Sequence, residues 1–331
     1  MSDLYEMAEG WKARLLSRER RAAGDLLRAY RLAAARVEAR VRDLTVRIDE
    51  TRRQGQEVGA GWLHERDRLT NLRREIIAEI GRFSEVASLS VARAQAAARA
   101  LGAEAARELI GEAGDAPVGI RLGVFSAQAS AAIAGFAADG SPLRQLFAEQ
   151  SVSVARRVAD ELVAGVAQGS GARVVASRIR GVLGGELSRA LTIARTETVR
   201  AYREATRETY ITNASVLRGW YWQAALGPRT CGMCLAMHGR VFPVEARLES
   251  HPNCRCVQVP LTLQAPDPES GPRWFTRQET GLQKSVLGPA KFKAFTEGKV
   301  ELKDLVGVRH SERWGVSRFE QSLSAILSRG E

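Results

Sequence analysis

Apolar residues recur every three or four positions over two stretches in the first third of the chain, and charged side chains flank both stretches. The apolar positions are Leu26, Tyr30, Ala33, Val37, Val41, Leu44 and Ile48 in the first stretch, and Leu69, Leu72, Ile76, Ile80 and Phe83 in the second. This period predicts two amphipathic helices. Because a polar, glycine-containing segment separates them, we expect a helical hairpin that forms a coiled-coil-like arm.

Helix-forming sequence continues well beyond this hairpin. An alanine-rich stretch runs from residue 85 to residue 114 and ends at Asp115-Ala116-Pro117, a combination that breaks helices. Segments rich in Gly, Ser and Pro then separate three further predicted helices, over residues 124–138, 142–167 and 171–211.

The pattern changes to short strands after Arg218. We predict strands over residues 219–223, 240–242 and 257–260. Trp220 and Trp222 alternate on the first strand, so both lie on one face and pack the preceding helix onto the loops that follow.

A proline-rich connector over residues 264–273 leads to a tail that returns to helix and stops at Leu287-Gly288-Pro289. The predicted fold is α+β and predominantly helical, with an extended helical N-terminal region followed by a small mixed α/β domain. The predicted division is a helical arm or hairpin region at 1–114, helices plus a Cys/His domain at 115–262, and a C-terminal linker and helical tail at 263–331.

The composition is that of a globular protein with an excess of positive charge. The 331 residues are 45% hydrophobic, which excludes wholesale disorder, and the net charge of +11 favours anionic partners such as DNA. An arginine-rich chain from a GC-rich genome is the alternative explanation. The N-terminus lacks the pattern of a secretory signal, and the longest uncharged run, residues 122–138, is too short and polar to span a bilayer. We therefore expect no membrane partner.

Arginines on the predicted helix at 171–211 are the candidates for weak, sequence-independent contact with DNA phosphates. The candidates are Arg173, Arg178, Arg180, Arg189, Arg200 and Arg203. The alternative is that these arginines pair with glutamates on the same or neighbouring helices, which leaves little net field.

All four cysteines lie within one short window as Cys231-Gly232-Met233-Cys234 and Cys254-Arg255-Cys256. The first spacing is that of a metal knuckle, and the two cysteines of the second pair point to the same side of an extended segment. We predict a structural zinc site with Cys231, Cys234 and Cys254 as ligands. The favoured fourth ligand is Cys256, and the alternative is His251, which has knuckle spacing to Cys254.

Disulfides, free buried thiols and a redox pair remain alternatives at this cluster. The redox alternative requires the first pair to open a helix in a βαβ unit, and the preceding Leu226-Gly227-Pro228 does not favour that context. Nucleobase-deaminase, P-loop, serine-hydrolase and zinc-protease motifs are all missing from the sequence. These enzyme classes are therefore not indicated, and the family resemblance described next implies a protein that is not an enzyme.

The order of motifs around the cysteines carries a family resemblance. Ala194-Arg195-Thr196-Glu197 on a helix precedes Trp220 and Trp222, and then come Thr230-Cys231-x-x-Cys234, His238-Gly239-Arg240-Val241-Phe242 and His251-Pro252-Asn253-Cys254-Arg255-Cys256. This order resembles the Mu F-like minor head proteins of tailed bacteriophages over roughly residues 160–262. Many members carry an acidic residue just before the Arg-Thr-Cys equivalent, where this chain has Gly227-Pro228.

The resemblance implies a virion structural protein inside the capsid near the portal, made in the host cytoplasm. It implies action in head morphogenesis, DNA packaging or DNA ejection, with the portal protein and other capsid components as partners. We expect the apolar face of the helical arm to dock on the portal or on other copies of the chain. The rivals are a zinc-stabilised DNA-binding protein of the host and a Mu F-like toxin-associated protein.

Overall fold

The computed structural model describes residues 2–64, 67–113, 135, 137, 141–311 and 315–328. The described residues form two compact units that are not consecutive in sequence. The helical unit comprises residues 20–94 and 135–195, and the mixed unit comprises residues 1–19, 95–134 and 196–331. Three long helices each contribute one part to both units, so the units differ from the three consecutive segments predicted from the sequence.

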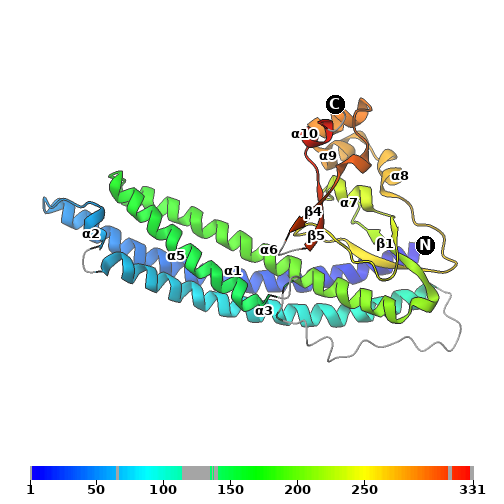
Figure 1. The fold of residues 1–331 in the computed structure, drawn as a ribbon, viewed down its shortest axis with the longest axis horizontal. Coiled ribbons are helices and arrows are strands. Elements are labelled where there is room, and N and C mark those ends of the chain that lie inside the picture. The colour runs from blue at the N-terminus through cyan, green and yellow to red at the C-terminus, as the bar shows by residue number, and fades with distance from the viewer. Residues whose placement is uncertain are drawn as a thin grey trace. The chain divides into compact units, whose positions relative to one another are not determined.

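The helical unit is built from four helices that run side by side (Figure 1). They are parts of α1 (Ser2–Arg53), α3 (Arg68–Glu112) and α6 (Ala172–Thr212), together with α5 (Leu143–Ala167). A short α2 (Ala60–His64) lies between α1 and α3 in sequence. The break between α5 and α6 falls where the sequence predicts it, whereas the predicted helix at 124–138 lies almost wholly outside the described residues.

Both predicted apolar stripes are confirmed as helix faces, and both are buried inside the helical unit. Phe83 of α3 packs edge-on against Tyr30 of α1 and against Phe147 of α5, with ring centroids 4.9 and 6.5 Å apart. The hydroxyl of Tyr30 donates a 2.6 Å hydrogen bond to the carbonyl of Leu183 in α6. All four helices therefore share one core.

This packing corrects the expectation that the stripe from Leu26 to Ile48 docks on the portal or on other copies. A narrow stripe needs a second apolar surface, and here α3, α5 and α6 provide that surface within the same chain. Sequence spacing identified the helix face but not its partner, because α5 and α6 are more than 90 residues away from the stripe.

The mixed unit is centred on a three-stranded antiparallel sheet in the order β2-β1-β3. The strands are β1 (Leu217–Gln223), β2 (Val241–Phe242) and β3 (Val257–Thr262), which confirms the three predicted strands. Trp220 pairs with Phe242 on one side, and Trp222 pairs with Gln258 on the other.

The two faces of β1 belong to different cores. Tyr221 packs with the first turns of α1, with α3 and with α6 in a core that includes Trp11 and Tyr202. Trp220 and Trp222 face the opposite core, which contains three of the cysteines, so the prediction that they share a face is confirmed. The helices on the first face approach closely, because a Cβ at Gly102 of α3 would lie 2.4 Å from the carbonyl oxygen of Tyr202.

The C-terminal segment differs from the predicted linker and helical tail. It contains α8 (Gly271–Thr276), α9 (Thr280–Thr296) and α10 (Leu323–Leu327), but also an antiparallel pair of strands, β4 (Val306–Ser311) and β5 (Gly315–Glu320). The predicted stop at Leu287-Gly288-Pro289 is a kink inside α9, where Gly288 has a φ of 73°. The strands were missed because their alternating pattern is short and interrupted by charged residues.

We expect Val37→Asp to destabilise the helical unit, because Val37 is fully buried in its core whereas Leu32 on the same helix is 56% exposed. Burying an unpaired carboxylate should lower the free energy of unfolding by more than about 3 kcal/mol, whereas Leu32→Asp should change it by less than about 0.5 kcal/mol. Urea titration, followed by the circular dichroism signal of the helices, measures the free energy of unfolding of both variants. Equal stability of the two variants would show that the stripe is not the core of the unit.

Candidate metal centre

Two loops of the mixed unit bring the cysteines together. Cys231 caps the N-terminus of α7 (Gly232–Met237), where its sulfur accepts a 3.4 Å hydrogen bond from the backbone N–H of Cys234. The second loop ends at β3 and contains a turn in which the N–H of Cys254 donates to the carbonyl of His251 at 3.2 Å. Asn253 takes the left-handed conformation that this turn needs, with a φ of 63°.

The donor atoms form two overlapping trios that share Cys234. Cys231, Cys234 and His251 make up one trio, and Cys234, Cys254 and Cys256 make up the other, with the donor atoms of each trio within 4.8 Å of one another. The Nε2 atom of His251 lies 3.4 Å from the Cys231 sulfur and 3.5 Å from the Cys234 sulfur. The sulfurs of Cys234 and Cys254 are 3.7 Å apart. The cluster has the donor types and the proximity to hold a metal ion.

All four cysteines are free thiols in this structure. The separation of the Cys234 and Cys254 sulfurs is well beyond the roughly 2.05 Å of a disulfide bond. Cys231 does open a helix, but the surrounding sheet is antiparallel, whereas the redox alternative requires a βαβ unit with parallel strands.

Two of the thiols are poised to lose their protons. Hydrogen bonding with Cys234 outweighs the effect of burial and, with help from His251, lowers the pKa of Cys231 to about 5. Hydrogen bonds with Cys234 and Cys256 lower the pKa of Cys254 well below its usual value, and the charge of Arg203 adds to this effect. Burial opposes the charged form of His251, but the hydrogen bond to Cys231 raises the pKa of His251 to about 9. Thiolates are the form that binds metals.

Arg203 of α6 connects the helix to the second loop. This side chain is 8% exposed, and its guanidinium donates hydrogen bonds to the carbonyl of Cys256 at 2.7 and 2.9 Å and to the carbonyl of Cys254 at 3.1 Å. It also donates to the Cys254 sulfur at 3.3 Å and to the Ser250 hydroxyl at 2.7 Å. The sequence-based assignment of Arg203 as a DNA contact is therefore wrong, because its donors are used inside the protein.

One face of α6 follows the loop at seven-residue intervals. The hydroxyl of Thr196 accepts a 3.1 Å hydrogen bond from the N–H of Asn253, and the hydroxyl of Tyr210 donates to the carbonyl of Gln258 at 3.2 Å. Arg203 lies midway between them, and residues seven apart project from the same side of a helix. This face positions the loop that carries Cys254 and Cys256, and sequence reasoning missed it because the contacts span about 50 residues.

The remaining charges near the knuckle form ion pairs inside the mixed unit. Glu197 is buried and accepts a 2.7 Å hydrogen bond from Arg200, whereas Arg255 pairs with the buried Glu19 of α1 at 3.4 Å. Arg200 thus forms an internal ion pair while its side chain stays partly exposed. The contact between Arg255 and Glu19 joins residues that are 236 apart, and nothing in the sequence pattern indicates it.

A comparison with protein-family models matches residues 156–259 to the family described as Phage Mu protein F like protein. Residues 156–259 thus form a Mu F-like region. The matched region begins within α5 and ends in β3, so it contains the whole cysteine cluster and the helix face that holds it. Curated proteins give no match to this chain, and neither do solved structures.

The DNA-contact candidates of the Mu F-like region fall into two groups. Arg200 and Arg203 belong to the mixed unit, where Arg200 pairs with the buried Glu197 and the buried Arg203 binds the second loop. The other four are exposed on the part of α6 in the helical unit: Arg173, Arg178, Arg180 and Arg189. The exposed four are the only candidates that still fit contact with an external anion.

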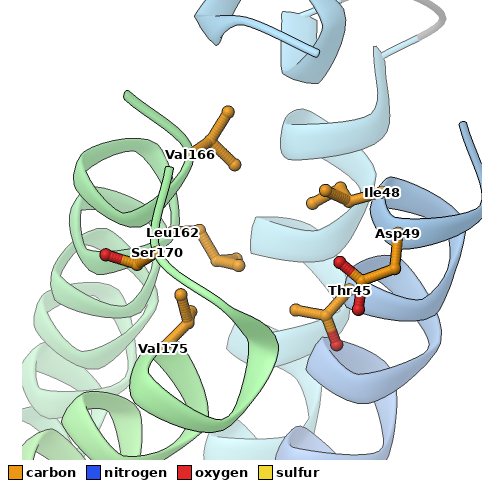
Figure 2. A pocket seen from close by; sticks show the side chains of 7 residues that line it. All are labelled: Thr45, Ile48, Asp49, Leu162, Val166, Ser170 and Val175. Carbon is orange, nitrogen blue, oxygen red and sulfur yellow. The ribbon is translucent and has the colours of Figure 1, made fainter. Parts of the chain in front are cut away.

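A small hollow in the helical unit offers a different kind of surface (Figure 2). Side chains of α1, α5, the turn after α5 and the start of α6 line it: Thr45, Ile48, Asp49, Leu162, Val166, Ser170 and Val175. Asp49 is the one titratable group among these seven residues. The other polar side chains of the lining are the hydroxyls of Thr45 and Ser170, so the hollow lacks the gathered thiols and imidazole of the cysteine cluster. Among the described helices, none is long and apolar enough to cross a membrane.

We expect the stability of the mixed unit to depend on pH through His238, which lies in the Mu F-like region but belongs to neither donor trio. Its Nδ1 accepts a 3.1 Å hydrogen bond from the N–H of Ala224, and burial lowers the pKa of His238 to about 4. The unfolded chain, with an ordinary histidine pKa near ~6.5, binds the proton more readily. The free energy of unfolding should therefore fall by about 3 kcal/mol as the pH drops from about 6.5 to about 4.

His238→Gln is the control, because it keeps a polar side chain and removes the titration. Denaturant titrations at several pH values should show a smaller slope for the variant than for the parent protein. Any acid-induced change at the cysteines is common to both proteins and cancels in the difference. Identical slopes would contradict the assignment to His238.

Proposed function

We propose that this protein is a minor head protein that sits inside the phage capsid at the portal and acts in head morphogenesis, DNA packaging or DNA ejection. The family match over residues 156–259 is the observation that carries the proposal, because that family is one of phage head morphogenesis proteins. Support also comes from the way Thr196, Arg203 and the cysteines converge on one knuckle, since these residues belong to the matched motifs. The portal and other head components are the proposed partners.

The role we propose for the cysteine cluster is structural. It offers five donors, four sulfurs and one imidazole, and a tetrahedral zinc site needs four. Three of the cysteines pack in the core with Trp220 and Trp222, away from solvent. Zinc bound there would cross-link α7 to the loop before β3. A closed, buried shell of this kind stabilises a fold and leaves no open position for a substrate, so we propose no enzymatic activity.

Protein purified without chelators should contain close to one zinc ion per chain by elemental analysis. Cys231→Ser should lower the melting temperature of the mixed unit, because the binding energy of a structural metal is part of the folding energy. Ser17→Ala, on the α1 segment of the same unit, serves as a neutral substitution. A folded parent protein without metal, or one whose mass corresponds to two disulfides, would contradict the zinc proposal.

Purified virions should contain this protein in far fewer copies than the major shell protein, and it should copurify with the portal. Quantitative proteomics of mature particles and of empty precursor heads measures both. If the protein acts in assembly and then leaves, the precursor heads still contain it. Its complete absence from both kinds of particle would refute the proposed location and favour the host DNA-binding rival.

The helical unit also supports non-specific contact with genomic DNA. Its sequence contains 24 basic and 16 acidic residues, a net charge of +8, against +3 for the mixed unit. Part of this charge is internal, since Arg157 pairs with the buried Glu186. The exposed arginines of α6 are the contacts we propose, and we propose no recognition of sequence, because no helix-turn-helix or finger motif is present in the sequence.

Two unrelated DNA duplexes should bind with equal affinity and with a steep dependence on salt. Replacing Arg173, Arg178, Arg180 and Arg189 with Gln should reduce the log–log salt slope by about 0.9 for each arginine that contacts a phosphate. The matched control replaces four exposed cations of the mixed unit with Gln and removes the same charge: Arg277, Lys293, Lys299 and Lys303. Equal reductions of the salt slope in the two variants would show that net charge, and not this helix, determines DNA binding.

A further inference from the structure

We infer that zinc in this protein is bound by Cys231, Cys234, Cys254 and His251, that Cys256 stays outside the shell, and that Arg203 is the buried counter-charge. The inference rests on the proposed zinc site and decides between its two possible fourth ligands. It reverses the preference for Cys256 that the sequence spacing alone suggests.

The position of His251 is the first support. Zinc–sulfur bonds of about 2.3 Å and zinc–nitrogen bonds of about 2.0–2.1 Å, set at a tetrahedral angle, place a nitrogen and a sulfur ligand roughly 3.5 Å apart. The Nε2 atom of His251 lies 3.4 and 3.5 Å from the sulfurs of Cys231 and Cys234. The same geometry places two sulfur ligands roughly 3.8 Å apart, and the Cys234 and Cys254 sulfurs are 3.7 Å apart.

The other ring nitrogen of His251 is the second support. Nδ1 lies 2.8 Å from the carbonyl oxygen of Pro252, which only accepts hydrogen bonds, so Nδ1 must carry the proton that it donates. In the neutral ring the lone pair is then on Nε2, which faces the two sulfurs. A histidine that binds metal through one nitrogen and donates from the other to a backbone carbonyl is the usual arrangement at zinc sites.

Charge balance is the third support. Zinc with three thiolates and a neutral histidine has a net charge of −1, whereas zinc with four thiolates has −2. The guanidinium of Arg203 supplies one positive charge and donates directly to the Cys254 sulfur. Arg255 is already paired with Glu19. The three-thiolate shell is therefore neutralised by Arg203, and a four-thiolate shell would leave an uncompensated negative charge in the core, which is costly.

Cys256 has a different role in this arrangement. Its carbonyl accepts two hydrogen bonds from Arg203, and its side chain packs in the core that contains Trp220 and Trp222. Free cysteine behaves as a small apolar residue in such a core. Cys256 thus anchors the loop through its backbone. Its sulfur lies within 4.8 Å of the Cys234 and Cys254 sulfurs, and in the proposed shell it contacts these ligands without binding the ion.

The test compares Cys256→Ser with His251→Ala in the full chain. Zinc content is measured by native mass spectrometry and zinc affinity by competition with a chelator. We expect Cys256→Ser to retain one ion with an affinity within about 3-fold of the parent. His251→Ala should lower the zinc affinity by more than about 100-fold, which exceeds the roughly 10–100-fold loss typical of changing a residue outside the ligand shell. If Cys256→Ser misfolds, Cys256→Ala replaces it in the same measurements of zinc content and affinity.

Cobalt substitution gives a readout that does not depend on stability. Thiolate-to-cobalt charge-transfer absorption grows with the number of thiolate ligands, so Cys256→Ser should keep the parent spectrum. His251→Cys should restore binding and increase that absorption, because it supplies a fourth thiolate. It also shows that a loss of metal in His251→Ala is not misfolding.

Arg203 is tested as a positioning residue. Arg203→Gln should weaken zinc binding by about 10–100-fold, and Arg203→Lys, which keeps the charge, should recover part of the loss. Equal losses for Gln and Lys would contradict the counter-charge role. A Cys256→Ser variant that loses zinc, or a His251→Ala variant that keeps it, overturns the ligand assignment and leaves the zinc proposal standing. A parent protein without zinc instead refutes the zinc proposal itself.

Discussion

The carbonyl groups of Cys254 and Cys256 lie inside the mixed unit, where a buried acceptor needs a hydrogen-bond donor. Arg203 supplies those donors from α6. Seven residues earlier Thr196 binds the same loop, and seven residues later Tyr210 binds Gln258 of β3, the strand that follows the loop. A loop with irregular backbone therefore keeps a fixed course through the core. The positions of the cysteine sulfurs, and of the strand that follows them, depend on this face of one helix.

The sheet of the mixed unit transmits that constraint to the rest of the unit. β1 is buried on both faces, with Tyr221 toward the helices and Trp220 and Trp222 toward the cysteines. Its neighbour β3 begins directly after Cys256, so the loop held by Arg203 also sets the register of β3 against β1. The C-terminal segment adds a third core on the far side of α7, where the N–H of Gly232 donates to the carboxylate of Glu320 at 2.7 Å.

Periodic and local features of this fold were predictable from the sequence, and long-range ones were not. The helical stripes, the strands around Trp220 and the gathering of the four cysteines follow from spacings of a few residues. Other contacts join residues about 50 to 240 positions apart, and no local pattern encodes them. They are the contacts of Arg203 with the loop, of Arg255 with Glu19, and of the α1 stripe with α5 and α6. The exposure of the arginines on α6 was not predictable either, because the four exposed arginines and the buried Arg203 look alike in the sequence.

The assembly of the mixed unit from distant segments has a consequence for synthesis. Trp11 and Leu15 of α1 share a core with Val259 and Leu261 of β3, which leave the ribosome about 240 residues later. At translation rates of about 5–20 residues per second, the side chains of Trp11 and Leu15 wait roughly 10–50 s for their partners. During that interval the first turns of the chain expose an apolar surface that a chaperone of the host can bind, so the yield of folded protein depends on how quickly the nascent chain is protected.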